Sequence, residues 1–220
     1  MSARNIVSLK FNDGRPDVVG LDKVNQILRT VGVRASTLDI PKEAKPILKE
    51  SQTRPLTEEE KDHLISIFYL NKEQLLEQVK LAGRQPAVQV DGMLTEETGT
   101  GLYSKVYDTL AFDQATHKAV LENTDMDEVM TIVSGGGVIA RFQVDKVGLD
   151  DPAVRMSYHG KGMHAGIMDA KQGTIVAFGH GAKEFTMRYD APDTRYAELL
   201  GTNTWIDFSG DMPGVLDQAK

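Results

Sequence analysis

Two adjacent carboxylates open the segment of the chain whose residue types could do chemistry. Asp127 and Glu128 stand directly before the apolar run Val129–Val133, which leads into the glycines Gly135–Gly137. Such a run between a polar start and glycines is typical of a β-strand that leads into a tight turn. A carboxylate carried into a cavity by such a strand can transfer protons or bind a metal ion.

Histidines in the same half of the chain make a metal site one of the alternatives. His164 begins a predicted strand, and His180 lies in a glycine-containing segment. Together with Glu122 and Glu128 they could form a set of two histidines and two carboxylates, which suits Fe, Mn or Zn. The spacing does not specify this set, because a lone histidine is commonly a surface or hydrogen-bonded residue.

The composition of the chain excludes several classes of partner and site. The chain has 220 residues, 40% hydrophobic residues and a formal net charge of −7. An acidic balance without basic runs argues against nucleic acid and against an anionic membrane as partners. The lack of cysteine excludes disulfides and thiolate sites, and no segment has the pattern of a signal peptide or a bilayer span. We therefore expect a cytoplasmic protein.

The N-terminal half predicts a mixture of strands and helices. Residues Asn5–Phe11 alternate as in a strand, residues 21–31 have one apolar helical face, and Val33–Ile40 predicts a second strand. Pro41 and Pro46 predict a connection. Capping boxes at Thr57-x-x-Glu60 and Asn71-x-x-Gln74 predict two helices. A short strand is expected at Ala87–Val90, and a loop with a short helix at Thr95–Leu110.

The second half predicts a sandwich or a closed barrel, because many short β-like runs follow one another with turn residues between them. These runs are His117–Leu121, Val129–Val133, Val138–Val144, Val154–Tyr158, His164–Met168, Thr174–Phe178, Glu184–Tyr189, Tyr196–Leu200 and Thr204–Phe208.

The β-rich half resembles a cupin, a small barrel with two metal-binding motifs, and most of the chain is similar to acireductone dioxygenases. The similarity rests on the N-terminal NIVSLKF and GLDKVNQILRTVGVRASTLDI, on DEVMTIVSGGGVIARF, and on the late segment from GTIVAFGHGAKEF to the Gly-Asp after the tryptophan. The resemblance implies a mainly β fold, a cupin (double-stranded β-helix or jelly-roll) barrel. Residues 1–220 would form a single domain, with residues 1–115 as an N-terminal α/β decoration and residues 116–210 as the core barrel.

The same resemblance implies an altered metal site. The family binds Fe or Ni through three histidines and one glutamate. Position by position, only Glu128 keeps its type, while Glu122, Thr124 and Lys183 stand where the histidines would be. A lysine ammonium has no lone pair for a metal, so no cofactor is expected, although Fe, Ni, Mn or Zn remain alternatives.

Three interpretations of this altered site stay open. Lys183 could plug the barrel between Glu122 and Glu128, or these three residues could be catalytic, with Glu128 or Lys183 transferring protons. Alternatively, Glu122, Glu128, His164 and His180 could form a rebuilt metal site. We expect Thr124, Arg141, His180 and Arg188 to contact a substrate, since an inward arginine can bind a carboxylate in a bidentate manner.

The predicted function follows from these interpretations. We expect a cupin of small-molecule metabolism that acts on or binds a small polar metabolite. A metal-dependent oxygenase or isomerase and a non-catalytic cupin that binds a ligand or protein are the alternatives. The expected partner is a small molecule, and an exposed barrel face would also allow a homodimer.

Overall fold

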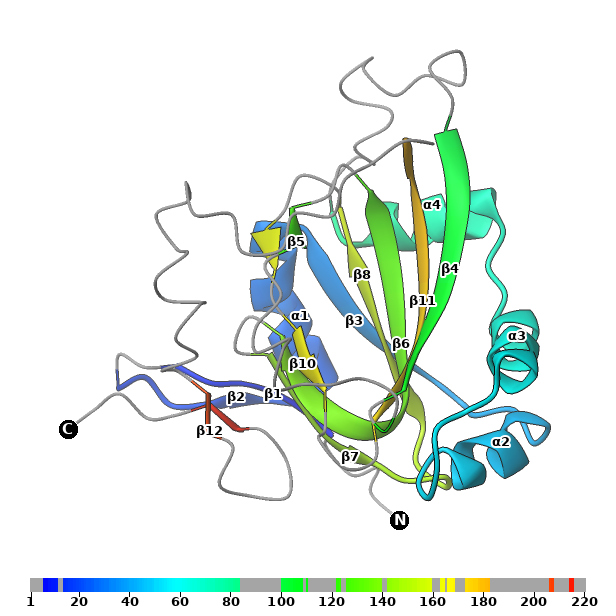
Figure 1. The fold of residues 1–220 in the computed structure, drawn as a ribbon. Coiled ribbons are helices and arrows are strands. Elements are labelled where there is room, and N and C mark those ends of the chain that lie inside the picture. Colours follow the sequence, from blue (N-terminus) through cyan, green and yellow to red (C-terminus); the bar gives the residue numbers. More distant parts are fainter. Residues whose placement is uncertain are drawn as a thin grey trace.

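The molecule is mainly β, with its helices in the N-terminal part, and the predicted fold class is confirmed at this level (Figure 1). The computed structural model describes residues 6–11, 14–83, 100–108, 110, 122–123, 126–139, 142–159, 163–164, 166–168, 173–182, 206–207 and 214–215. The predicted strands Ala87–Val90, His117–Leu121, Glu184–Tyr189 and Tyr196–Leu200 lie outside these residues. No helix in these ranges is long and apolar enough to cross a membrane.

Two antiparallel sheets share one long strand, β6 (Asp127–Ile139). In the first, which we call the five-stranded sheet, β6 lies between β11 (Thr174–Ala182) and β8 (Ala153–Tyr158); β4 (Thr100–Asp108) pairs with β11, and β3 (Val33–Leu38) pairs with β8. In the second sheet, β6 pairs with β7 (Phe142–Val147) and β10 (Gly166–Met168). Beyond β7 this sheet continues with β1 (Val7–Leu9) and ends with β2 (Val18–Val19).

The glycine run Gly135–Gly137 lies within β6 and does not end the strand, so the predicted turn there is wrong. β6 curves as it passes from one sheet to the other (Figure 1). Gly135 has a φ of 68°, and the register with β7 shifts between Gly135 and Gly137. A positive φ and a bulge bend a strand at little cost when the residue is glycine. The glycines therefore join the two sheets.

Strands of the first 115 residues belong to the sheets themselves. β1, β3 and β4 all pair with strands from the second half of the chain. The loop and short helix expected at Thr95–Leu110 are wrong, since β4 occupies most of this segment. Leu102 and Val106 suit either a helix or a strand. The segment forms a strand because Thr100 to Asp108 pair with β11.

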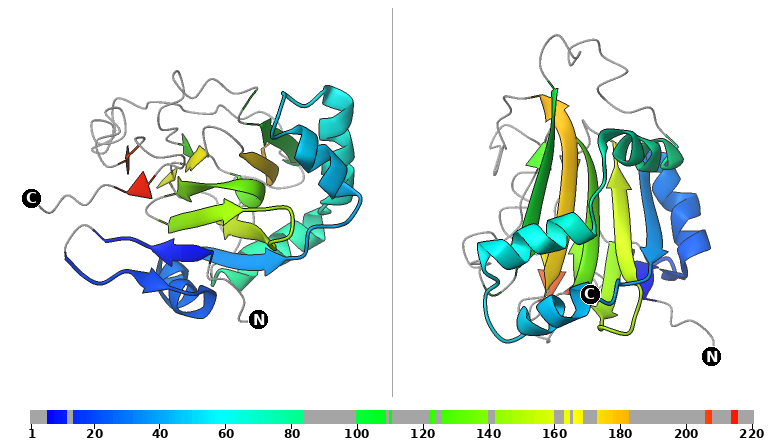
Figure 2. Two further views of the ribbon diagram at one scale, coloured as in Figure 1. Left: turned by 90° about the horizontal axis from the view of Figure 1, so that it is seen from below. Right: turned by 90° about the vertical axis from the view of Figure 1, so that its right-hand side faces the viewer.

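Three helices lie on one face of the five-stranded sheet, as the right-hand view of Figure 2 shows. They are α2 (Ala44–Glu50), α3 (Glu58–Ile67) and α4 (Lys72–Leu81), and α4 packs on β6 and β11. Their buried side chains, which include Leu48, Leu64 and Leu75, join those of the strands in one core. α2 replaces the predicted connection around Pro46, which lies in the first helical turn, where no N–H donor is required.

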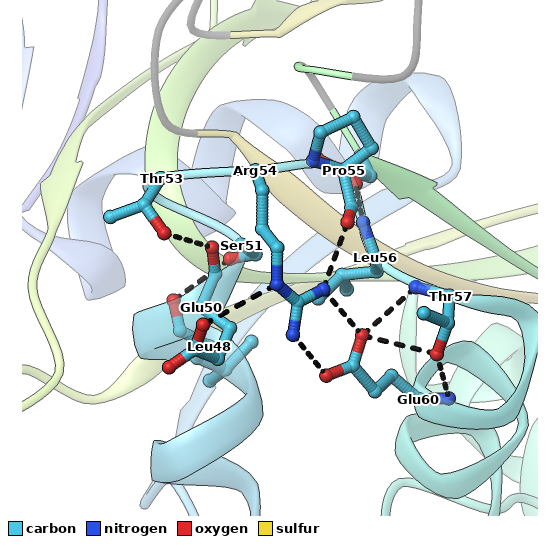
Figure 3. Close-up of polar contacts among 10 residues, drawn as sticks. Leu48, Glu50, Ser51, Thr53, Arg54, Pro55, Leu56, Thr57 and Glu60 are labelled. Atoms are coloured by element: carbon cyan, nitrogen blue, oxygen red, sulfur yellow. Dashed lines mark hydrogen bonds and ion pairs between the residues drawn. The ribbon is translucent and has the colours of Figure 1, made fainter.

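Local sequence signals set the ends of α3 and α4. Thr57 accepts a hydrogen bond from the Glu60 N–H and donates its own N–H to the Glu60 carboxylate, and Asn71 and Gln74 form the same reciprocal pair. Both predicted capping boxes are confirmed. The connection from α2 is held by Arg54, which donates to the two Glu60 carboxylate oxygens at 2.9 and 2.7 Å (Figure 3).

An asparagine protects the edge of the five-stranded sheet. α1 (Leu21–Leu28) packs beside β3 and buries Val24 and Leu28, as its apolar face predicts. A short 3-10 helix, η1 (Arg29–Val31), continues it. The Asn25 side chain donates to the Ala35 carbonyl and accepts from the Ala35 N–H, each at 2.8 Å. These bonds occupy edge groups that could otherwise pair with another strand.

Two short strand pairs complete the described elements. β5 (Glu122–Asn123) pairs with β9 (Met163–His164), and β12 (Ile206–Asp207) pairs with β13 (Gly214–Val215).

Candidate functional site

The two faces of the five-stranded sheet can be assigned from side-chain contacts. Phe178 packs edge-to-face on Tyr69, which lies between α3 and α4, with ring centroids 6.1 Å apart. Arg34 of β3 donates to Gln78 of α4 at 3.4 Å. These residues therefore point to the helix-covered face. Because side chains alternate along a strand, their neighbours in sequence point to the opposite face.

Glu128 lies on the opposite face at the centre of a row that crosses the sheet. Its partner on β11 is Gly179, and its partner on β8 is Tyr158. Tyr103 of β4 follows beyond Gly179 in the same row. Directly opposed residues in adjacent strands have Cβ atoms roughly 4.5–5.5 Å apart, so Tyr158 and Glu128 are side-chain neighbours. Glu128 thus has a tyrosine in the adjacent strand on one side and, beyond Gly179, a second tyrosine on the other.

Gly179 allows Met126 to pack closely over this row. A Cβ atom at position 179 would lie 3.2 Å from the Met126 sulfur and 3.7 Å from Cγ of Glu128. The first distance is tighter than an ordinary contact, so a larger residue would displace Met126. The lack of a side chain at position 179 thus makes room for Met126 beside Glu128.

The surroundings of Glu128 are mostly apolar. Glu128 is 6% exposed and Tyr158 is 4% exposed. Met130 and Met156 are partners in the next row of the same face, and the Tyr158 hydroxyl donates to the Met156 sulfur at 3.6 Å. Methionine side chains adapt their shape to what lies against them. A carboxylate and phenols in such surroundings can orient a small polar molecule through its hydroxyl or carbonyl groups.

The helix-covered face carries a second set of polar residues at the same end of the sheet. Asp127 is the partner of His180, and Ser157 lies on the same face of β8. Serine, histidine and aspartate are the residue types of a catalytic triad. Asp127, Ser157 and His180 are at most 1% exposed, however, and they lie on the face on which α4 packs. Asp127 and His180 are placed to stabilise the packing of the helices, whereas Ser157 adjoins Arg34, which is partly exposed.

This arrangement bears on the alternative metal site. The pairs His180–Asp127 and Gly179–Glu128 put His180 and Glu128 on opposite faces of the sheet. The rebuilt metal site requires both side chains to bind one metal ion, and this placement does not allow that. Glu122 and His164, its other two members, are Cα partners in the β5–β9 pair. Within the part of the chain that the structure describes, no group of three or more potential ligands could hold a metal.

The remaining predicted site residues are Thr124, Arg141, Lys183 and Arg188, and they lie outside the described residues. Tyr103 and Tyr158 were missed by the sequence analysis. Tyr158 closes a predicted strand, but only the pairing of β8 with β6 shows that it stands beside Glu128. His180, predicted to contact substrate beside Glu128, lies on the helix-covered face.

Comparisons with known proteins found one similar structure. An acireductone dioxygenase from Bacillus anthracis with a cadmium ion in its active centre is 16% identical; the match covers 85% of this chain and all of that chain, with a TM-score of 0.49. No family model matches the chain, and no curated protein matches it.

Proposed function

We propose that this protein is a cupin-type protein that acts on or binds a small polar metabolite next to Glu128. The observation that carries the proposal is the row Tyr103–Gly179–Glu128–Tyr158 on the face away from the helices. A buried carboxylate with Tyr158 in the adjacent strand and adaptable methionine side chains around it suits an oxygen-rich ligand. Glu128 would accept a proton or a hydrogen bond from the ligand, and Tyr158 would orient it.

In this proposal the reaction differs from that of an Fe- or Ni-dependent dioxygenase and needs no metal ion. In the sequence resemblance, Glu128 is the one ligand position that keeps its residue type, and His180 does not point to the same face. Lys183 directly follows β11 in the sequence, at a position where a cation could serve in place of a metal ion. Catalysis would then rest on proton transfer by Glu128 or Lys183, with Glu122 as a third charged group.

Ligand binding tests the proposal. A panel of hydroxy acids, keto acids and sugars is added to the purified full chain, and ligand-induced changes in Tm are measured. We expect at least one class to stabilise the wild-type protein and Glu128→Gln to lose this response. The matched control is Glu77→Gln, which alters an exposed glutamate of α4. An unchanged response in Glu128→Gln would overturn the proposed site. Stabilisation without turnover of the same compound would support ligand binding rather than catalysis for that compound.

Metal content tests the second part. The protein is purified without an affinity tag, and Fe, Ni, Mn and Zn are measured per chain. We expect substoichiometric metal that does not depend on residue 128. Near-stoichiometric metal that is lost in Glu128→Ala would contradict the metal-free proposal and favour a metal-dependent oxygenase or isomerase.

A further inference from the structure

Two arginines lie on the helix-covered face, away from Glu128. Arg34 of β3 is the partner of Ser157 on β8, and Ser36 is the partner of Arg155. Arg34 and Arg155 are therefore diagonal neighbours on one face of adjacent strands. Diagonal neighbours lie roughly 7–8 Å apart, a separation that two long side chains can span to bind one group. We call these two residues the arginine pair.

Neither arginine forms an ion pair with a carboxylate among the described residues. Arg155 Nε donates to the Thr131 hydroxyl at 3.3 Å, and Arg34 donates to the neutral Gln78 amide at 3.4 Å. The protein nevertheless has 32 acidic and 25 basic residues, so acidic groups are abundant. Both arginines are partly buried, and burial lowers the pKa of Arg155. A partly buried cation without a counter-charge is costly, which indicates that the counter-charge comes from a ligand.

A buried hydroxyl lies between the two arginines. Ser157 is fully buried, and its Oγ forms no hydrogen bond with any described residue. It is the partner of Arg34 and stands two residues after Arg155 on the same face. Buried hydroxyl groups in proteins are normally hydrogen-bonded, so this one also indicates a group that completes it. The Ser36 and Thr131 hydroxyls flank Arg155 on either side.

We propose that the arginine pair, with Ser157, binds the oxyanion group of a small molecule, a phosphate or a carboxylate. Two guanidinium groups can donate several charge-assisted hydrogen bonds to such an anion, and the hydroxyl can donate another. Both guanidinium-bearing residues are partly exposed, so a small anion can reach them. The site lies on the other face of the sheet from Glu128 and does not depend on the function proposed there.

The test measures binding of inorganic phosphate, pyrophosphate and succinate to the full chain at constant ionic strength. Titration calorimetry and the shift in Tm are the readouts, and sodium chloride is the ionic-strength control. We expect saturable binding of at least one anion, weakened tenfold or more in Arg155→Met and in Arg34→Gln. Arg29→Gln, which removes an exposed arginine in η1, should bind as the wild type does. A preference for phosphates or for succinate identifies the source of the oxyanion.

Stability without added anion separates a ligand site from a structural role. Because Arg155 has no counter-charge among the described residues, Arg155→Met should have a Tm equal to or above that of the wild type, and phosphate should no longer raise it. Glu128→Gln should keep the full anion response. The proposal is overturned if no anion binds in a saturable manner, or if Arg155→Met and Arg34→Gln bind as tightly as Arg29→Gln.

Discussion

Asp127 and Glu128 are neighbours in sequence, and the two faces of the five-stranded sheet give them different surroundings. Asp127 points to the helix-covered face, where it lies opposite His180 of the neighbouring strand and is completely buried. Glu128 points to the opposite face, where it stands between Gly179 and Tyr158 among methionines. The alternation of a strand thus separates two carboxylates that look equivalent in the sequence. We expect changes on the helix-covered face near Asp127 to affect stability, and changes around Glu128 to affect ligand binding.

The largest effect is expected from Phe178→Ala on the helix-covered face. Phe178 is fully buried and packs on Tyr69. Loss of a buried phenylalanine costs about 3–5 kcal/mol of unfolding free energy. Urea denaturation measures this. Tyr69→Ala is the matched variant, because Tyr69 is 56% exposed. It should lower the unfolding free energy only by the value of the aromatic pair, about 0.5–1.5 kcal/mol. Equal losses in the two variants would show that Phe178 is not part of the core.

A smaller effect is expected where the helical layer is fastened to the sheet. The buried Asp108 of β4 accepts hydrogen bonds from the Leu56 N–H at 2.6 Å and from the Leu110 N–H at 3.2 Å. Asp108→Ala would leave a buried N–H without its acceptor and cost about 1–3 kcal/mol. Urea denaturation would detect the loss, and limited proteolysis should show faster cleavage between α2 and α3. Asp108→Asn, which retains an acceptor oxygen, should lose less; a loss as large as that of Asp108→Ala would point to the charge.

The cap of α4 should contribute about 1 kcal/mol. Asn71→Ala removes the acceptor of the Gln74 N–H and one half of the capping box. Thermal unfolding measures the change, and Asn71→Ser, which can still cap the helix, is the control. Since α4 lies on the face away from Glu128, ligand responses at Glu128 should be unchanged. A lost ligand response in a folded Asn71→Ala protein would contradict the division between the two faces.

The smallest effect concerns pH. The hydrogen bonds from Arg54, followed by that from the Thr57 N–H, lower the pKa of Glu60 from 4.5 to about 2. A carboxylate with a lowered folded-state pKa stabilises the protein above its unfolded pKa, and this contribution is lost as the pH falls from about 4.5 towards 2. Unfolding measured across this range should show a shallower loss of stability in Glu60→Gln than in the wild type. Because this pair is at the surface, high salt should reduce the difference; parallel curves at low salt would contradict the assignment.

The sequence predicted best what depends on neighbouring residues. The capping boxes at Thr57 and Asn71 and the helical face of Val24 and Leu28 need no distant partner, and all are confirmed. Predictions that depend on distant pairing fared worse. Gly135–Gly137 has the composition of a turn but bends a strand held between other strands, and residues 100–108 form a strand because β11 lies beside them.

The candidate site shows the same limit. Alternation alone predicts that Asp127 and Glu128 diverge, but the side on which the helices pack is decided by contacts such as that between Tyr69 and Phe178. For the same reason Glu128 was predicted and its neighbour Tyr158 was not. The arginine pair exists only because β3 pairs with β8, in a register that no local signal specifies.

One comparison tests the central claim most directly, the separation of Asp127 and Glu128 into structural and ligand-binding roles. Asp127→Asn and Glu128→Gln each remove one charge and keep the side-chain volume. The readout is Tm with and without a stabilising compound from the panel of hydroxy acids, keto acids and sugars. We predict a lower Tm but an intact ligand shift in Asp127→Asn, and a Tm close to that of the wild type with no ligand shift in Glu128→Gln. An intact shift in Glu128→Gln together with a lost shift in Asp127→Asn would contradict the account.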